Sequence, residues 1–154
     1  MMTENLHSKR LKIILTDDDE DDREMFSFVM GETGIPHNLK TFSNGLALLS
    51  YLQQDDCDFP DIIFLDLNMP VLDGIAALHK IRALEKCRQL PPIVIYSTSN
   101  NMVDIQKTFN SGANLYITKP NNFQSLKKVL QEVLTQYKSI MKLPVQFEDY
   151  CFQL

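Results

Sequence analysis

The sequence contains few cysteines, and their spacing suggests neither disulfides nor a metal site. The three cysteines, Cys57, Cys87 and Cys151, are odd in number, lie far apart in the chain and include no Cys-x-x-Cys motif. Disulfide frameworks and zinc sites both need paired or closely spaced cysteines. The pattern therefore favours free thiols in a reducing cytosol.

Long apolar runs and dense basic clusters are also missing. No window approaches the roughly 20 apolar residues of a membrane span, and residues 1–10 lack the apolar core of a signal peptide. The formal net charge of −5 and the lack of a Lys/Arg cluster argue against a nucleic-acid surface. We expect a cytoplasmic protein with no direct contact to membrane or nucleic acid. The 154 residues are enough for one domain with a proper core.

The most informative stretch is a short apolar run that ends in an aspartate. Ile62 to Leu65 is continuous and apolar and is bounded by polar, proline and glycine residues, which predicts a strand buried on both faces. Asp66 follows directly. The carboxyl end of a buried parallel strand is where α/β proteins bind ligands, although aspartate is also common in turns and could simply cap one.

Four other segments have the composition of strands, and helical spacing follows each strand. The expected strands cover residues 11–15, 38–42, 62–65, 93–96 and 114–117. The expected helices cover about 20–32, 45–52, 74–81, 102–111 and 122–137. Candidate N-caps are Asp19, Asp73 and Asn121. This alternation predicts an α/β fold, a flavodoxin-like (βα)5 doubly wound parallel sheet with strand order 2-1-3-4-5.

Polar residues follow these strands at the edge where their carboxyl ends should meet. The first and third strands are neighbours in the expected order, and they deliver Asp17, Asp18 and Asp66 to the same place. The ends of the fourth and fifth strands add Ser97 and Lys119. Six consecutive acids begin at Asp17. A solvated helix start explains the last four well, but it explains the two at the strand end less well.

A cluster of carboxylates at such an edge offers oxygen ligands to a metal ion. Mg²⁺ favours few carboxylates, several waters and a substrate phosphate, and a cation would relieve the repulsion among the acids. A carboxylate such as Asp66 can attack phosphorus and form an acyl phosphate. Lys119 can then bind a phosphoryl oxygen as a point charge, and the Ser97 hydroxyl can donate a hydrogen bond to another.

Four segments in order resemble the response-regulator receiver domain, and the resemblance covers residues 11–138. They read Ile-Ile-Leu-Thr-Asp-Asp-Asp from residue 13, Leu-Asp-Leu-Asn-Met-Pro-x-Leu-Asp-Gly from residue 65, Ile-Tyr-Ser-Thr-Ser from residue 95 and Tyr-Ile-Thr-Lys-Pro from residue 116. The chain resembles the stand-alone, chemotaxis-type regulators of two-component signalling. The resemblance implies phosphorylation by a histidine kinase or a histidine phosphotransfer protein. It also implies a signal passed to a downstream protein, with no enzyme activity beyond self-catalysed phosphoryl transfer and hydrolysis.

The resemblance implies roles for the acidic residues. Asp66 would accept the phosphoryl group. Mg²⁺ would be bound by Asp18 directly, by Asp17 through water, by Asp66, and by the backbone carbonyl of Asn68. The family pattern therefore assigns both the phosphorylation site and the metal site to one edge of the sheet.

The resemblance also assigns a phosphoryl contact and a switch. Lys119 would contact the phosphoryl group and would be joined to Pro120 by a cis bond. Ser97 would move to bond a phosphoryl oxygen, and the Tyr116 ring would fill the space that it leaves. This rearranges the surface of the fourth helix, fifth strand and fifth helix. Thr98 stands where many relatives have alanine or glycine, and its bulk should narrow access to the site.

Three alternatives use the same features. A haloacid-dehalogenase-like, Mg²⁺-dependent phosphatase also has a nucleophilic aspartate after a buried strand, but it needs a second aspartate two residues on, where this chain has Asn68. A phosphate-sink or shuttle receiver would share the chemistry without an output of its own. A flavodoxin-like FMN carrier needs a phosphate-cradling loop after the first strand, where this chain has acids.

The receiver segment 11–138 is flanked by an N-terminal extension, 1–10, and a C-terminal tail, 139–154. The tail is too short for a DNA-binding or enzymatic output domain. Phe147, Tyr150 and Phe152 make it too apolar for a solvated tail. We expect it to pack back on the domain or to contact another copy of the chain in a homodimer.

Overall fold

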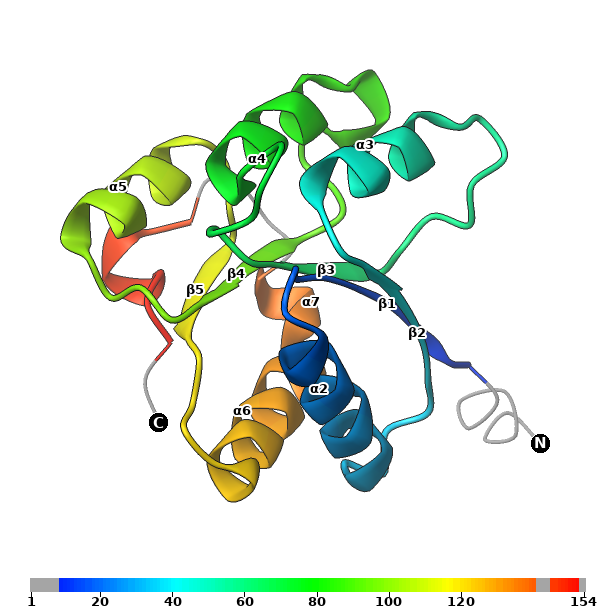
Figure 1. Cartoon of the computed structure of the whole chain (residues 1–154), viewed down its shortest axis with the longest axis vertical. Coiled ribbons are helices and arrows are strands. Elements are labelled where there is room, and N and C mark those ends of the chain that lie inside the picture. Colours follow the sequence, from blue (N-terminus) through cyan, green and yellow to red (C-terminus); the bar gives the residue numbers. More distant parts are fainter. Residues whose placement is uncertain (1–8, 141–144, 153–154) are drawn as a thin grey trace.

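The computed structural model of the chain describes residues 9–140 and 145–152 and shows a five-stranded sheet between two layers of helices (Figure 1). The strands are β1 (Leu11–Thr16), β2 (His37–Phe42), β3 (Ile62–Leu65), β4 (Ile93–Ser97) and β5 (Leu115–Thr118). The helices are α2 (Glu20–Glu32), α3 (Gly45–Gln53), α4 (Gly74–Ala83), α5 (Met102–Asn110), α6 (Phe123–Thr135) and α7 (Tyr137–Ile140). Two short 3₁₀ turns are η1 (Glu85–Cys87) and η2 (Phe147–Asp149).

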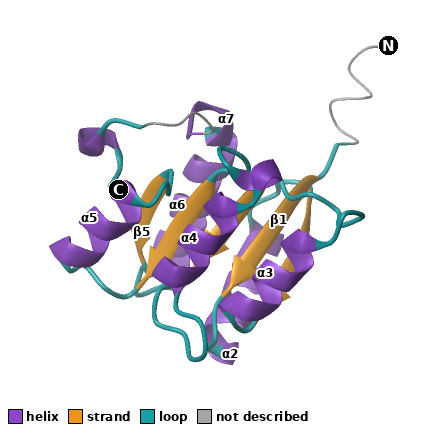
Figure 2. Ribbon diagram, turned by 90° about the horizontal axis from the view of Figure 1, so that it is seen from above, coloured by secondary structure: helices purple, strands orange, loops and turns teal. Residues whose placement is uncertain are grey.

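The sheet confirms the predicted fold. Its order is β2-β1-β3-β4-β5, and every neighbouring pair is parallel. Helices α3, α4 and α5 cover one face, and α2 and α6 cover the other (Figures 1 and 2). All of β3 is buried because it lies in the middle of the sheet with both faces covered. The carboxyl ends of β1, β3, β4 and β5 therefore share one edge.

The helix boundaries differ from the predicted ones mainly at the last helix. Asp19 and Asp73 cap α2 and α4 as predicted, since each side chain accepts a hydrogen bond from the backbone N–H three residues on. The prediction of Asn121 as a cap is wrong. Asn122 caps α6 instead, because its own side chain reaches the N–H three residues on. The single helix expected over 122–137 is divided into α6 and α7.

Each face of the sheet has its own apolar cluster. On the face of α2 and α6, the Phe26 ring meets Phe64 and Tyr96 edge to face, with ring centroids 5.1 Å and 5.6 Å apart. On the other face, residues of α3, α4 and α5 pack over β3 and β4. Within the described part of the chain, no helix is both long and apolar enough to span a bilayer.

Residues 145–152, here called the tail segment, return to the domain beside β5 and α5 (Figure 1). Tyr150 is fully buried in the cluster on the α5 face. The tail segment thus adopts one of the two arrangements expected for it. The division of the chain at residues 10 and 138 stays a prediction, and residues 1–8, 141–144 and 153–154 lie outside the described part.

Candidate functional site

Asp66 lies at the carboxyl end of β3, where backbone hydrogen bonds hold it. Its N–H donates to the Thr16 carbonyl of β1 at 2.9 Å, and its Oδ1 accepts from the Leu67 N–H at 2.8 Å. Helix α4 begins close against this point because Gly74 has no side chain: a Cβ there would overlap the Asp66 carbonyl oxygen and lie 2.7 Å from the Leu67 Cα. Asp66 is only 5% exposed as a result.

Two acids from the end of β1 join Asp66. Asp17 is fully buried, whereas Asp18 is exposed. One carboxylate oxygen from each of Asp17, Asp18 and Asp66 lies within 4.8 Å of the others. Three carboxylates at this spacing, with one open to solvent, suit a small divalent cation that keeps several water ligands. The chemistry of the donors therefore fits Mg²⁺.

Lys119, which follows β5, extends its side chain into this acidic cluster. Its Nζ lies 2.7 Å from Asp17 Oδ2, 2.8 Å from Asp22 Oδ2 and 3.6 Å from Asp66 Oδ2. The same Nζ lies 5.3 Å from the centroid of the Tyr96 ring. The structure thus brings a cation whose side chain is only 9% exposed within reach of the predicted nucleophile.

These contacts shift the pKa values of Asp66 and Lys119. Burial raises the pKa of Asp66 from 3.8 to about 6; Lys119 opposes the shift, Asp17 adds to it, and backbone N–H groups oppose it. Burial lowers the pKa of Lys119, but the hydrogen bonds to Asp17 and Asp22 and the charge of Asp66 outweigh it, so this pKa lies above its usual value. Lys119 is therefore charged at neutral pH, and Asp66 changes charge near pH 6.

Asp22 is the site residue that the sequence analysis missed. The acids after Asp19 were interpreted as a solvated helix start, yet Asp22 forms an ion pair with Lys119 from the first turn of α2. Helical side chains tilt toward the N-terminus of their helix. A first-turn acid of α2 could therefore have been expected at the edge where β1 ends.

The predicted switch residues lie on the same edge. Ser97 is fully buried at the end of β4, its Oγ accepts from the Ser99 N–H at 3.2 Å, and its carbonyl accepts from the Lys119 N–H at 2.8 Å. The Tyr116 ring is 1% exposed, and its hydroxyl donates to the Ser99 carbonyl at 2.8 Å. Thr98 is exposed beside Ser97. The ring therefore has the inward orientation that the predicted switch assigns to the phosphorylated state.

Comparison with known proteins identifies the family to which this fold and site belong. A family model described as the response regulator receiver domain matches residues 13–131. This chain belongs to the response-regulator receiver family. It is thus a receiver domain of two-component signalling, and the fold and motifs described above are those of its family.

Similar proteins include single-domain regulators. Response regulator Rcp1 of Synechocystis sp. is 30% identical over 136 residues, which cover 86% of this chain and 92% of Rcp1. Chemotaxis protein CheY-3 of Vibrio cholerae is 31% identical over 130 residues, covering 84% and 96%. The crystal structure of the phosphorylated cyanobacterial phytochrome response regulator RcpA superposes with a TM-score of 0.78 at 30% identity, covering 89% of this chain and all of RcpA. Rcp1 has also been solved in a Mn²⁺-bound form, with a TM-score of 0.74 at 29% identity, covering 88% of this chain and 99% of the solved one.

One feature implied by the family resemblance is wrong for this receiver. The bond between Lys119 and Pro120 was expected to be cis. Within residues 9–140 and 145–152, the bond between Leu90 and Pro91 is the one cis peptide bond. The bond between Lys119 and Pro120 is therefore trans. Trans is the form that most bonds before proline adopt, and in it the Lys119 ammonium reaches its carboxylate partners. The side chain of Asn68, the fourth predicted metal-binding residue, is exposed next to the site.

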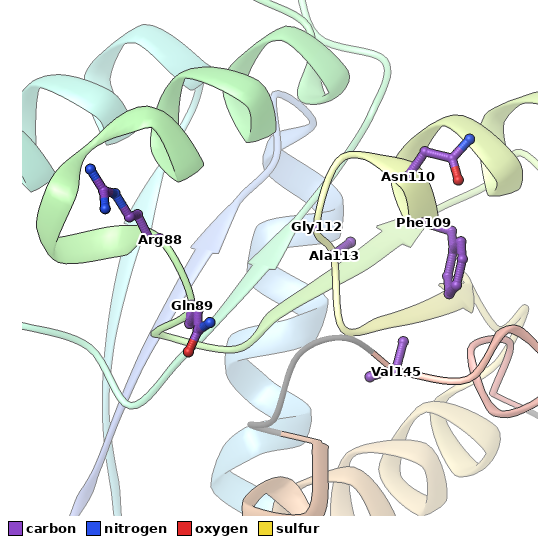
Figure 3. A pocket seen from close by; sticks show the side chains of 7 residues that line it. All are labelled: Arg88, Gln89, Phe109, Asn110, Gly112, Ala113 and Val145. Carbon is purple, nitrogen blue, oxygen red and sulfur yellow. The ribbon is translucent and has the colours of Figure 1, made fainter.

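A hollow of about 460 Å³ (Figure 3) lies near the amino ends of β4 and β5, whereas Asp66 follows the carboxyl end of β3. The residues that line it include Arg88, Gln89, Phe109, Asn110, Ala113 and Val145. They come from the loop before β4, the end of α5, the turn before β5 and the tail segment. The predicted site residues gather at the carboxyl ends of the strands. This hollow lies elsewhere, where the tail segment meets the domain.

Proposed function

We propose that this receiver accepts a phosphoryl group on Asp66 from a histidine kinase or a histidine phosphotransfer protein and passes a conformational signal to a downstream protein. The observation that carries the proposal is the meeting of buried Asp66 with Asp17, Asp18 and Lys119, which come from three different strand ends. One carboxylate alone would be a turn residue. Two further acids and a cation make it a phosphoryl-transfer site.

The chemistry follows from the charges at this edge. A lone pair of the ionised Asp66 carboxylate forms the new O–P bond while the bond from phosphorus to the donor histidine nitrogen breaks, and that nitrogen takes up a proton from solvent. The pKa of about 6 means that Asp66 is mostly ionised above that pH. Lys119, already 3.6 Å from Asp66 Oδ2, would then pair with a phosphoryl oxygen.

Asp17, Asp18, Asp66 and the carbonyl of Asn68 are the groups that would hold Mg²⁺. When bound, the ion neutralises negative charge that accumulates as a phosphoryl group approaches the carboxylates. The burial of Asp17 keeps its carboxylate oriented toward this edge, and one of its oxygens accepts from the Asp19 N–H at 3.0 Å. The exposure of Asp18 leaves the site open to solvent and to a donor.

The signal would leave the domain through α5, β5 and α6. Ser97 would donate to a phosphoryl oxygen, and the Tyr116 ring would be held inward beside it. A phosphate-sink or shuttle receiver would use the same transfer chemistry without this last step. The phosphatase alternative gains no support, because the position of its acid/base aspartate is Asn68.

The remaining properties are proposed on the sequence alone. The protein would work in the cytoplasm, without direct binding of membrane or nucleic acid, as the receiver 11–138 with an extension and a tail. The tail would also allow a homodimer, in which it contacts a second copy of the chain. None of these properties is needed for phosphoryl transfer to Asp66.

Intact-mass measurement after incubation with acetyl phosphate and Mg²⁺ tests the proposal. We expect one phosphoryl adduct on the wild-type chain that is stable in acid, labile in base and absent with EDTA. Asp66→Asn should carry none, whereas Asp55→Asn, which removes the same charge from an exposed loop, should match the wild type. If wild type gains no adduct from acetyl phosphate or from a phosphohistidine protein, the proposal is wrong.

A further inference from the structure

The tail segment continues the sheet beyond β5. The Tyr116 N–H donates to the Tyr150 carbonyl at 2.8 Å, and the Phe152 N–H donates to the Tyr116 carbonyl at 2.9 Å. Cys151 is paired with Tyr116 in a parallel bridge. β5 is the last strand of the sheet, so its outer edge would otherwise present unpaired backbone groups. The tail segment satisfies both backbone groups of Tyr116, the proposed switch residue.

A buried aromatic side chain anchors the tail segment. Tyr150 is 0% exposed, and its hydroxyl donates to Thr108 Oγ1 of α5 at 2.7 Å. Its ring centroid lies 5.3 Å from that of Phe109, and Phe147 meets the same Phe109 ring at 5.0 Å. At the other end of the segment, Val145 borders the hollow of Figure 3. The close packing of the tail segment on α5 therefore depends on Phe147 and Tyr150.

Tyr150 also restricts the Tyr116 ring. The two rings meet edge to face with centroids 6.2 Å apart, and both are buried. Tyr150 lies on the outer side, between β5 and α5, while the Tyr116 hydroxyl points inward to the Ser99 carbonyl. Because interiors are close-packed, the Tyr116 ring cannot turn outward while Tyr150 is docked. A docked tail therefore requires the inward ring.

We propose that docking of the tail segment and phosphorylation of Asp66 stabilise the same state of the receiver and so reinforce each other. The inference rests on the proposed function, in which the phosphoryl group also favours the inward Tyr116 ring. A protein that pairs with the edge of β5 must then displace the tail, and its binding would weaken phosphoryl retention. Linkage makes the coupling reciprocal: each event favours the other by the same factor.

Beryllium trifluoride, which mimics an acyl phosphate on a carboxylate, provides the test. Its dissociation constant would be measured with saturating Mg²⁺ on the full chain, on Tyr150→Ala and on Phe152→Pro. Phe152→Pro removes one backbone donor to Tyr116 but leaves the Tyr150 side chain in place. This variant therefore still tests the coupling if Tyr150→Ala fails to fold. We expect both variants to bind about 5-fold or more weakly, and Glu148→Ala, an exposed residue of the same segment, to bind as the wild type does.

The reciprocal measurement is amide hydrogen exchange in the wild-type chain. Saturation with beryllium trifluoride should slow exchange of the Tyr116 and Phe152 N–H groups by the same factor that the tail variants lose in affinity. Equal dissociation constants in all four proteins would overturn the coupling while leaving the proposed function intact. Binding to none of them would overturn both. A dissociation constant that changes with protein concentration would place the tail on a second copy of the chain and overturn the intramolecular proposal.

Discussion

Replacement of Asp66 by asparagine should stabilise the folded protein at neutral pH. The wild-type carboxylate is buried beside Asp17, and these surroundings raise its pKa from 3.8 to about 6. An amide has nearly the same shape, its oxygen can still accept the Leu67 N–H, and it carries no charge. Asp66→Asn therefore removes a group whose ionised form the fold disfavours.

The sign and size of the change in the free energy of unfolding follow from proton linkage. At pH values between 3.8 and about 6, the folded chain binds more protons at Asp66 than the unfolded chain does, so the free energy of unfolding falls as pH rises through this window. The gap between the two pKa values corresponds to about 3 kcal/mol above the window. Asp66→Asn should recover about this amount near pH 8 and less than about 1 kcal/mol near pH 4.

Urea unfolding in EDTA, monitored by far-UV circular dichroism, would measure the gain in the free energy of unfolding near pH 8 and near pH 4. Asp55→Asn is the matched control, because it removes an equal charge from an exposed loop. Addition of Mg²⁺ should raise the stability of the wild type and leave that of Asp66→Asn nearly unchanged, since the cation screens the same repulsion. A gain equal at the two pH values would show a packing effect instead, and no gain near pH 8 would refute the electrostatic reasoning.

Three other substitutions test the site. Gly74→Ala should destabilise the fold by about 1–3 kcal/mol in urea unfolding, because its Cβ would overlap the backbone at Asp66; an unchanged midpoint would contradict the close approach. Asp22→Asn should release Lys119 from one partner and speed phosphorylation by acetyl phosphate up to about fivefold, whereas Asp21→Asn, which is exposed on the same turn, should not. Thr98→Ala should load and lose the phosphoryl group faster than the wild type in intact-mass time courses, and equal rates would show that Thr98 does not restrict access.

Local patterns were enough to predict the fold and most of the site. The apolar run of β3, buried on both faces, placed Asp66 at a strand end, and alternation with helical segments required a parallel sheet. Parallel strands bring their carboxyl ends to one edge, so Asp17 and Asp18 had to lie near Asp66 once the strand order was known. The caps Asp19 and Asp73 were also predictable, because a cap bonds only its own first turn.

The tertiary structure alone decided the contacts that depend on exact spacing between distant elements. Asp22 meets Lys119 across 97 positions of sequence, and whether a first-turn acid faces solvent or a lysine depends on how α2 sits against β5. The isomer of the bond before Pro120 likewise depends on the surrounding loop, because the intrinsic preference between isomers is small.

The position of the tail segment is the clearest example of a contact that sequence alone did not predict. The aromatic content of residues 147–152 predicted burial but not its location, because burial of apolar surface is non-directional. One position became more stable than the others only once β5 and α5 were assembled. There the outer backbone groups of β5 lie beside the Thr108 hydroxyl and the Phe109 ring. Sequence determined which acids and which lysine gather at Asp66, and tertiary structure determined that Tyr150 covers Tyr116, the proposed switch residue.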